Sequence, residues 1–243
     1  MNRRRSAPRP DGVLYAVGDI HGRDDLLDRL MRRILAEAAG APVPPALVFL
    51  GDYVDRGPRA RETVEVLMGL AGRAEVAPVF LMGNHERMLL DYLADPDTGT
   101  RWFRVGGIET LESYGLRVPG GAEHDPVALA DLSEAFAEAV APHRAFLEGL
   151  APSHLSGEVL CVHAAADPAR PPAAQEEGAL LWGHRDFARR PRRDGLWVVH
   201  GHVVVPHPRV EGRRISVDTG AWFTDTLTAV RLDGDGIAFV TSD

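Results

Sequence analysis

The sequence feature that most limits the possible folds is a unit that occurs three times near the start of the chain. Each unit has a short apolar run, then a polar loop, and then apolar residues at helical spacing; the runs are residues 13–17, 46–50 and 78–82. Strands that alternate with helices predict a parallel sheet with helical crossovers. In such a sheet the loops after the strands meet at the carboxyl edge, where ligands bind. The predicted fold class is therefore α/β.

The three loops carry side chains that bind metals or phosphate. The first contains Asp19 and His21, which project from the same side of an extended chain because they are two residues apart. The others contain the remaining polar groups of interest: Asp52, Asp55 and Arg56, then Asn84 and His85. Any one loop could be an ordinary acidic turn or helix cap. Their recurrence at one sheet edge favours a metal site.

The rest of the chain continues this pattern after an interruption. Residues 95–155 break the strand and helix alternation, and we interpret them as a helical insertion within a single domain that covers residues 11–243. Strand-like runs then lead to His163 and to His202. We expect residues 1–10 to form a disordered basic tail. Four other histidines lack ligand spacing and are expected at the surface: His124, His143, His154 and His207.

Charge and composition exclude several classes of protein. The chain has 27 Lys and Arg residues against 35 Asp and Glu residues, a net charge of −8. That balance argues against binding to nucleic acid or to an anionic membrane. No apolar run is long enough for a signal peptide or a membrane span, so we expect a cytoplasmic protein. The single cysteine, Cys161, lies in an apolar run and is expected to be a buried, inert thiol.

The polar side chains at the strand ends predict a pair of divalent cations. The candidate ligands are Asp19, His21, Asp52, Asn84, His163 and His202. Oxygen and imidazole ligands without thiolates suit manganese, iron or zinc better than a structural zinc site. Asp52 could bridge two ions, and paired ions are a recurrent device for phosphoester hydrolysis. His85 could donate a proton to the leaving group, with Asp55 behind it, and Arg56 could stabilise phosphate charge.

These motifs resemble those of a known family. The segments Gly18 to Gly22, Gly51 to Gly57 and Gly83 to Glu86, in this order, are similar to the three signature motifs of the phosphoprotein phosphatases, which are calcineurin-like metallophosphoesterases. A later segment supports the same resemblance, since Gly201-His202 matches a glycine–histidine pair whose histidine is a metal ligand in the family. This match favours His202 over His200 as the candidate ligand. The resemblance is closest to the bacterial and phage serine/threonine phosphatase branch. It implies two packed mixed β-sheets flanked by helices, a four-layer α/β/β/α sandwich.

The resemblance also implies roles for individual residues. Manganese is the metal often used in the family, and His85 is implied as the general acid, with Asn84 and Arg56 at the phosphate. One ion would be held by Asp19, His21 and Asp52, and the other by Asp52, Asn84, His163 and His202. The chain departs from the branch where an arginine usually stands two residues after a tryptophan, because His184 occupies that place and Arg185 follows it. Either Arg185 or His184 could then bind the phosphate. We favour Arg185, because a guanidinium binds phosphate bidentately and a neutral imidazole does not.

Three functions are compatible with this set of residues. The leading prediction is a serine/threonine protein phosphatase, whose partner would be a phosphorylated protein or a small phosphoester. Diadenosine tetraphosphatases of the symmetrical type share the motifs and would need only a different access loop. A pseudophosphatase that binds phosphopeptides without catalysis is a minor alternative, because every ligand and each of His85, Asp55 and Arg56 is present.

Overall fold

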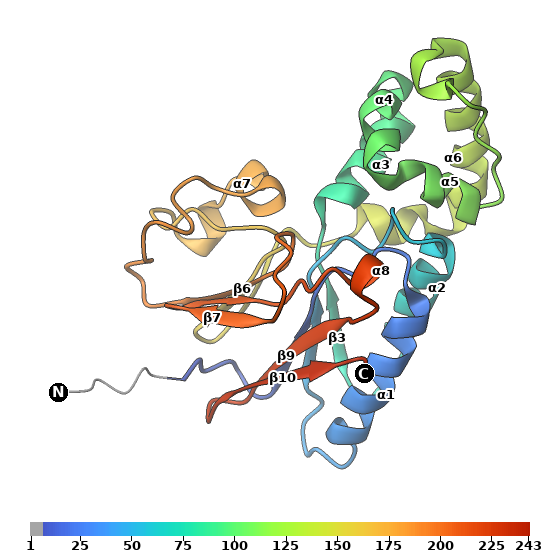
Figure 1. Ribbon diagram of the computed structural model, residues 1–243. Helices are drawn as coiled ribbons and strands as arrows, with labels where there is room; N and C mark the ends of the chain where they lie inside the picture. Colours follow the sequence, from blue (N-terminus) through green and yellow to red (C-terminus); the bar gives the residue numbers. More distant parts are fainter. Residues whose placement is uncertain (1–6) are drawn as a thin grey trace.

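Two five-stranded sheets form the centre of the protein, whose computed structural model describes residues 7–243 (Figure 1). The first sheet has the order β10-β9-β1-β2-β3, in which β1, β2 and β3 are parallel and β9 is antiparallel to both of its neighbours. Its strands are β1 (Leu14–Val17), β2 (Ala46–Phe49), β3 (Ala77–Phe80), β9 (Thr228–Leu232) and β10 (Ile237–Thr241). The three sequence units therefore form neighbouring parallel strands, as predicted.

The second sheet is mixed and is formed mainly by the later part of the chain. Its order is β4-β5-β6-β8-β7, with β5, β6 and β8 parallel. Its strands are β4 (His154–Ser156), β5 (Val159–Cys161), β6 (Trp197–His200), β7 (Arg209–Glu211) and β8 (Arg214–Ser216). The strands that lead to the predicted ligands His163 and His202 are thus neighbours in one sheet.

Side chains alternate along each strand, so neighbouring residues contact different layers. In β1, Leu14 and Ala16 point between the two sheets, whereas Tyr15 and Val17 point toward the helices. The layer between the sheets is closed from the other side by Val159 and Val199, among others. The outer face of the second sheet packs against α7 (Glu177–Trp182) and neighbouring loops. The predicted α/β/β/α layering is confirmed, although the helical layer on the second sheet is thin.

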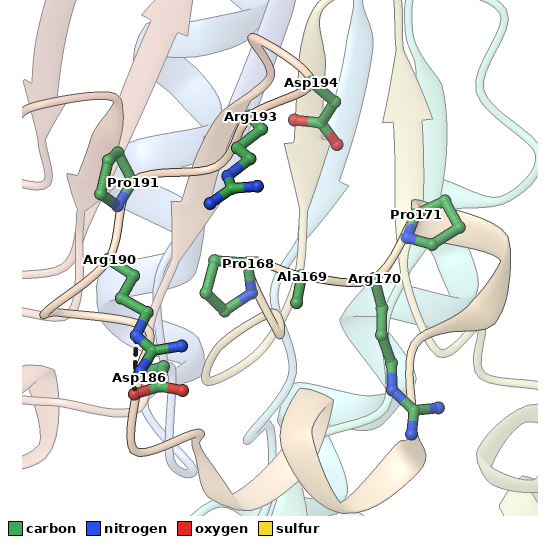
Figure 2. A pocket seen from close by; sticks show the side chains of 9 residues that line it. All are labelled: Pro168, Ala169, Arg170, Pro171, Asp186, Arg190, Pro191, Arg193 and Asp194. Carbon is green, nitrogen blue, oxygen red and sulfur yellow. Dashed lines mark ion pairs between the residues drawn. The ribbon is translucent and has the colours of Figure 1, made fainter.

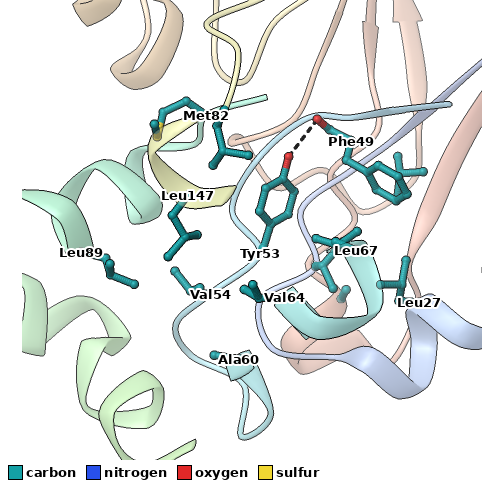
Figure 3. Close-up of a cluster of buried hydrophobic side chains, with 14 of the residues drawn as sticks. Leu27, Phe49, Tyr53, Val54, Ala60, Val64, Leu67, Met82, Leu89 and Leu147 are labelled. Carbon is teal, nitrogen blue, oxygen red and sulfur yellow. Dashed lines mark hydrogen bonds between the residues drawn. The ribbon is translucent and has the colours of Figure 1, made fainter. Parts of the chain in front are cut away.

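Helices cover the outer face of the first sheet. One follows each of the first three strands: α1 (Asp24–Ala38), α2 (Ala60–Leu70) and α3 (Asn84–Ala94). Figure 3 shows how the second polar loop joins this core, because Tyr53 and Val54 lie among buried aliphatic side chains. The Tyr53 hydroxyl donates to the Leu81 carbonyl at 2.7 Å. The loop therefore alternates polar side chains for the site with side chains that fix it to the core.

Residues 95–153 form the irregular helical region at the upper right of Figure 1. It contains η1 (Pro96–Thr98), α4 (Gly99–Trp102), η2 (Phe103–Gly107), α5 (Ile108–Ser113), η3 (Ala122–His124) and α6 (Pro126–Glu148). Its apolar side chains, such as Trp102 and Phe136, share one core with the helices of the first sheet. His143 of α6 is buried and lies 2.7 Å from the Tyr114 hydroxyl, so the predicted surface position of this histidine is wrong.

The predicted tail, residues 1–10, lies partly outside the described residues. Of the described part, Pro8 is buried and the Arg9 carbonyl accepts a hydrogen bond from the Glu158 backbone at 2.8 Å. These contacts hold residues 8–10 against the turn between β4 and β5. Within residues 7–243, no helix is both long and apolar enough to cross a membrane.

Candidate active site

The loops after β1, β2 and β3 are locked together by their backbones. The Asp52 carbonyl accepts hydrogen bonds from the amides of Ile20 and His21, at 3.0 and 2.9 Å. Close approach explains two glycines, since a Cβ at Gly51 would lie 2.6 Å from the Gly83 nitrogen and a similar clash would occur at Gly57. Several site residues have left-handed backbones: His21, Asp52, Asp55, Arg56 and His202. Such strain clusters at functional sites, where surrounding contacts over-determine the conformation.

Glu86 clamps the second and third loops and was not predicted to do so. Its fully buried carboxylate accepts hydrogen bonds from the amides of Asp52 (2.8 Å), Tyr53 (2.6 Å), Val54 (3.2 Å) and Gly83 (3.0 Å). Burial and the nearby Asp52 charge raise the pKa of Glu86 to about 7, against the lowering effect of its amide donors. The clamp fixes the backbone on which the Asp52 side chain is carried.

Asp52 lies between two groups of metal-type side chains. One group is His21, Asp52 and His85, and the other is Asp52, His163 and His202. The Asp52 Oδ2 atom is 3.6 Å from His21 Nε2 and 3.4 Å from His163 Nε2. Burial would raise the pKa of Asp52, but the surrounding histidines outweigh burial and lower it. The structure thus brings candidate ligands from both sheets to one shared carboxylate.

The histidines present lone pairs that fit a divalent cation. His21 Nδ1 donates to the Val54 carbonyl at 2.8 Å and His163 Nδ1 to the Leu50 carbonyl at 2.9 Å, which leaves each Nε2 unprotonated in a neutral ring. Burial lowers the pKa of His21 to about 3 and also lowers that of His163. The buried His21 Nε2 has no hydrogen-bond partner among residues 7–243.

The group of Asp52, His163 and His202 also indicates a bound cation. The unprotonated His163 Nε2 lies 2.9 Å from Asn84 Oδ1 and 3.2 Å from His202 Nδ1. An imidazole lone pair that faces an amide oxygen and a carboxylate oxygen is unfavourable unless a cation lies between them. The donor set therefore fits a divalent metal of the borderline class.

Asp19 and Asp218 form an acidic side of the site. Asp19 is 3% exposed and accepts a 3.0 Å hydrogen bond from the His202 amide. Burial, followed by the charges of Asp218 and Asp52, raises the pKa of Asp19 well above its usual range. Asp218, also 3% exposed, has its pKa raised to about 6 by burial. Three buried carboxylates this close together require a positive charge for stability.

Asp218 is a site residue that the sequence analysis missed. It follows β8 by two residues, as Asp19 follows β1, and Asp52 similarly follows β2 by three. In the sequence, the short run Ile215-Ser216-Val217 leads directly into Asp218-Thr219-Gly220. Since β8 pairs with β6, its end lies beside the strand that leads to His202.

His85 lies between a carboxylate and a guanidinium. Its Nδ1 lies 2.6 Å from Asp55 Oδ2, and its Nε2 lies 3.2 Å from Arg56 Nη2. Burial lowers the pKa of His85, but the charges of Asp52 and Asp55 more than compensate and raise it to about 8. Asp55 is itself held by the Trp102 indole N–H at 2.8 Å and by the Thr110 hydroxyl at 2.6 Å. The helical insertion therefore positions the carboxylate behind His85, which the sequence did not predict.

A model of the calcineurin-like phosphoesterases matches residues 13–223. The chain belongs to this family. It is also 29% identical over 235 residues to the asymmetrical bis(5'-nucleosyl)-tetraphosphatase PrpE of Geobacillus sp. strain WCH70, and 30% identical over 238 residues to PrpE of Bacillus velezensis. The matches cover 88% of this chain in both cases, and 88% and 87% of the relatives.

Two solved structures share the fold of this phosphoesterase. One was described as a candidate diadenosine tetraphosphatase (TM-score 0.61, 20% identity, 96% of this chain and 95% of that chain). The other is a protein serine/threonine phosphatase from Saccharomyces cerevisiae (TM-score 0.60, 17% identity, 96% and 80%). The calcineurin-like metallophosphoesterase family, the fold and the hydrolase class are confirmed. The predicted serine/threonine branch is not, because the curated relatives above carry the name of an asymmetrical tetraphosphatase.

In the described part of the chain, three other predicted or considered residues, His184, Arg185 and His200, make no hydrogen bond or ion pair with the candidate metal ligands through their side chains. His184 accepts a hydrogen bond from the Asp186 amide at 3.3 Å and lies 3.8 Å from Asp167 Oδ2. Arg185 is exposed, and no contact among residues 7–243 joins it to the six candidate ligands. His200 is buried with Nε2 at 3.0 Å from the Ser216 hydroxyl and Nδ1 at 3.1 Å from the Gly201 carbonyl, so both of its nitrogens serve the fold.

A separate hollow of about 550 Å³ lies beside the second sheet of the phosphoesterase (Figure 2). Its lining comes from the loops before and after α7 and includes three arginines and three prolines. An ion pair joins Arg190 to Asp186 at 3.5 Å, marked by the dashed line. None of the candidate catalytic or metal-binding residues lines this hollow.

Proposed function

We propose that this phosphoesterase hydrolyses bis(5'-nucleosyl) tetraphosphates asymmetrically, to a nucleoside triphosphate and a nucleoside monophosphate. The observation that carries the proposal is the 29–30% identity to two asymmetrical tetraphosphatases across 88% of this chain. The family model matches residues 13–223, a range that includes both sets of candidate ligands. The proposal replaces the symmetrical cleavage considered from the sequence, which is not the activity in the relatives' names.

The candidate ligands would hold two divalent ions, and we favour manganese. One ion would be held by Asp19, His21 and Asp52, and the other by Asp52, Asn84, His163 and His202. When bound, such ions supply a nucleophile at neutral pH and neutralise phosphate charge. Asn84 begins α3, so its amide side chain is also placed where the helix N-terminus favours an anion.

The chain's own residues would perform the remaining tasks. Arg56 would bind the oxygens of the phosphate under attack, because a planar guanidinium matches them bidentately. When the phosphate engages Arg56 in place of the contact from Arg56 to His85 Nε2, His85 would carry a proton at Nε2 for the departing phosphate oxygen, while its Nδ1 stays on Asp55. The hydrogen bonds from Trp102 and Thr110 keep that carboxylate in place without exposing it to water. The arrangement orients the acid before substrate binds.

A second guanidinium would come from Arg185, since His184 is already engaged with Asp186 and Asp167. An exposed arginine on a loop can reach a polyphosphate that extends out of the site. Arg185 would therefore bind a phosphate further along the chain, while Arg56 binds the one that reacts.

A phosphoprotein phosphatase is the second candidate. It is supported by the order and spacing of the three motifs, which resemble those of the phosphoprotein phosphatases. The fold shared with a yeast serine/threonine phosphatase is compatible with it. A binding protein without catalysis is less well supported, because the acid His85, its partner Asp55 and the cation Arg56 are all assembled in contact.

A substrate comparison tests the proposal. The manganese-loaded protein is given diadenosine tetraphosphate and a phosphoserine peptide, and products are separated by chromatography. We expect ATP and AMP, with kcat/KM at least about tenfold above that for the peptide. Two molecules of ADP, or faster phosphate release from the peptide, would contradict it. The Asp52→Ala variant, prepared in parallel, controls for contaminating hydrolases.

A further inference from the structure

An exposed tryptophan stands beside the phosphate-binding guanidinium. Trp222 lies in α8 (Ala221–Thr224) and is 40% exposed, and the Arg56 Cζ atom is 5.6 Å from the centroid of its ring. The ring of Phe223, 55% exposed, meets it edge to face with centroids 4.9 Å apart. Neither aromatic side chain contributes to the buried core, so core packing does not explain them.

The backbone around Trp222 is fixed, although its side chain is exposed. Arg23 donates to the Ala221 carbonyl at 3.2 Å and to Asp225 Oδ1 at 2.6 Å. The Gly220 amide donates to Asp218 Oδ1 at 2.8 Å, which ties the start of α8 to a carboxylate of the site. In Figure 1, α8 lies at the upper end of the first sheet. An aromatic face held in this way is preorganised for a ligand.

Further apolar side chains lie on the same side of the site. Val203 and Val204 follow the candidate ligand His202 directly and are 54% and 41% exposed. The next residue, Val205, donates its amide to the Asp218 carbonyl at 2.9 Å, so this segment runs beside the one that leads to α8. The buried charged cluster is thus bordered by an exposed apolar and aromatic surface.

We propose that Trp222 is the stacking surface for the nucleobase of the nucleotide whose phosphate binds at Arg56. The inference rests on the proposed function and names the subsite that recognises a nucleotide. A flat indole beside a guanidinium matches the two ends of a nucleoside monophosphate, a planar base and an anion, with one ribose between them. Aliphatic side chains such as Val203 would border the ribose and base.

The short separation between Arg56 and Trp222 also predicts which phosphate reacts. With the base on Trp222, the phosphate at Arg56 is the one attached to that ribose, the α-phosphate. The oxygen of one water molecule bonds to the α-phosphorus, and the bond from that phosphorus to the bridging oxygen breaks. The bridging oxygen leaves on the nucleoside triphosphate and takes the proton from His85. The attacking water loses one proton to solvent, and His85 then regains its proton from solvent. The products are one nucleoside monophosphate and one nucleoside triphosphate, which is asymmetrical cleavage.

Calorimetry of product binding tests the subsite without catalysis. The manganese-loaded protein is titrated with AMP and with ribose 5-phosphate, which differ only by the base. We expect AMP to bind about tenfold more tightly, because stacking on an aromatic side chain typically gives a gain of this order. Trp222→Leu keeps an apolar side chain but no aromatic face and should remove the difference, whereas Trp222→Phe should retain most of it.

The control is Phe239→Ala, which removes an exposed aromatic side chain from β10 and should leave the ratio unchanged. Equal affinities in the wild type, or an unchanged ratio in Trp222→Leu, would overturn the inference. Failure of the proposed function would be seen separately, as absence of diadenosine tetraphosphate hydrolysis in a protein that still prefers AMP. If hydrolysis occurs in ¹⁸O-labelled water, the label should enter AMP; label in ATP would place the base elsewhere.

Discussion

The loops after β1, β2 and β3 differ sharply from the loop after α7, although both carry residues predicted to bind phosphate or metal. The first set is buried and tied by backbone hydrogen bonds and by the carboxylate of Glu86. The loop after α7 carries Arg185 in solvent and turns His184 toward Asp167. The comparison indicates that the residues predicted to share a cation are held on a fixed backbone, whereas the residue predicted to contact an extended substrate is not.

The largest effect is expected at the centre of the fixed region. Asp52→Ala removes the carboxylate that both groups of metal-type side chains share. We expect kcat/KM to fall by at least about a thousandfold, since nucleophile activation and charge neutralisation are lost together. Steady-state kinetics on p-nitrophenyl phosphate measures this, with circular dichroism to show that the variant is folded. A loss below about tenfold would mean that Asp52 does not bridge the site.

Asp55 is the next test of the fixed region, because it acts through His85. Asp55→Asn keeps the shape but removes a charge that raises the His85 pKa to about 8. We expect kcat to fall about a hundredfold with little change in KM. Because the acid must be protonated, activity declines as pH rises through its pKa, and the variant should decline at lower pH than the wild type. An unchanged alkaline limb would exclude His85 as the group that sets it.

The glycines test whether close backbone contact holds the site. Gly51 has φ +104° and a Cβ there would lie 2.6 Å from the Gly83 nitrogen, so Gly51→Ala should lower the free energy of unfolding by about 2 kcal/mol or more. Gly69 in α2 faces open space, and Gly69→Ala should be neutral or stabilise by about 0.5–1 kcal/mol. Urea unfolding compares the two variants. Equal effects would contradict the assignment of strain to the site loops.

The smallest effects are expected in the loop after α7. Arg185→Ala should raise KM for diadenosine tetraphosphate by roughly tenfold, because one charge-assisted contact to phosphate is lost. His184→Ala should leave KM within about twofold, because its contacts are to Asp167 and Asp186. The choice between the residues is wrong if Arg185→Ala leaves KM and kcat unchanged while His184→Ala raises KM.

The first sheet and its ligands could be predicted because their signals are local. A strand, its loop and its helix are adjacent in sequence, so Asp19, Asp52 and Asn84 could each be placed at the carboxyl edge of one sheet. The residues that hold the site side chains in place are distant from them in sequence. Trp102 and Thr110 reach Asp55 across 47 and 55 residues, through a helical insertion whose packing no periodicity reveals.

Short strands also give too little sequence pattern to locate a residue of the site. Asp218 follows a strand of three residues, whose pattern is too brief to point to a sheet edge unless its pairing with β6 is known. Sequence alone also could not decide between His184 and Arg185. The sequence places His184 where the family pattern has an arginine, and only the contacts in the structure show that His184 faces Asp167.

The central claim is that one buried carboxylate joins ligands of two sheets around two ions. Its most direct test is the number of manganese ions bound per chain, measured by mass spectrometry after removal of free metal. We predict two ions in the wild type, one in His163→Ala, which removes a ligand of one group only, and loss of both tight sites in Asp52→Ala. Binding of one ion or none by the wild type, or two ions by Asp52→Ala, would contradict the account.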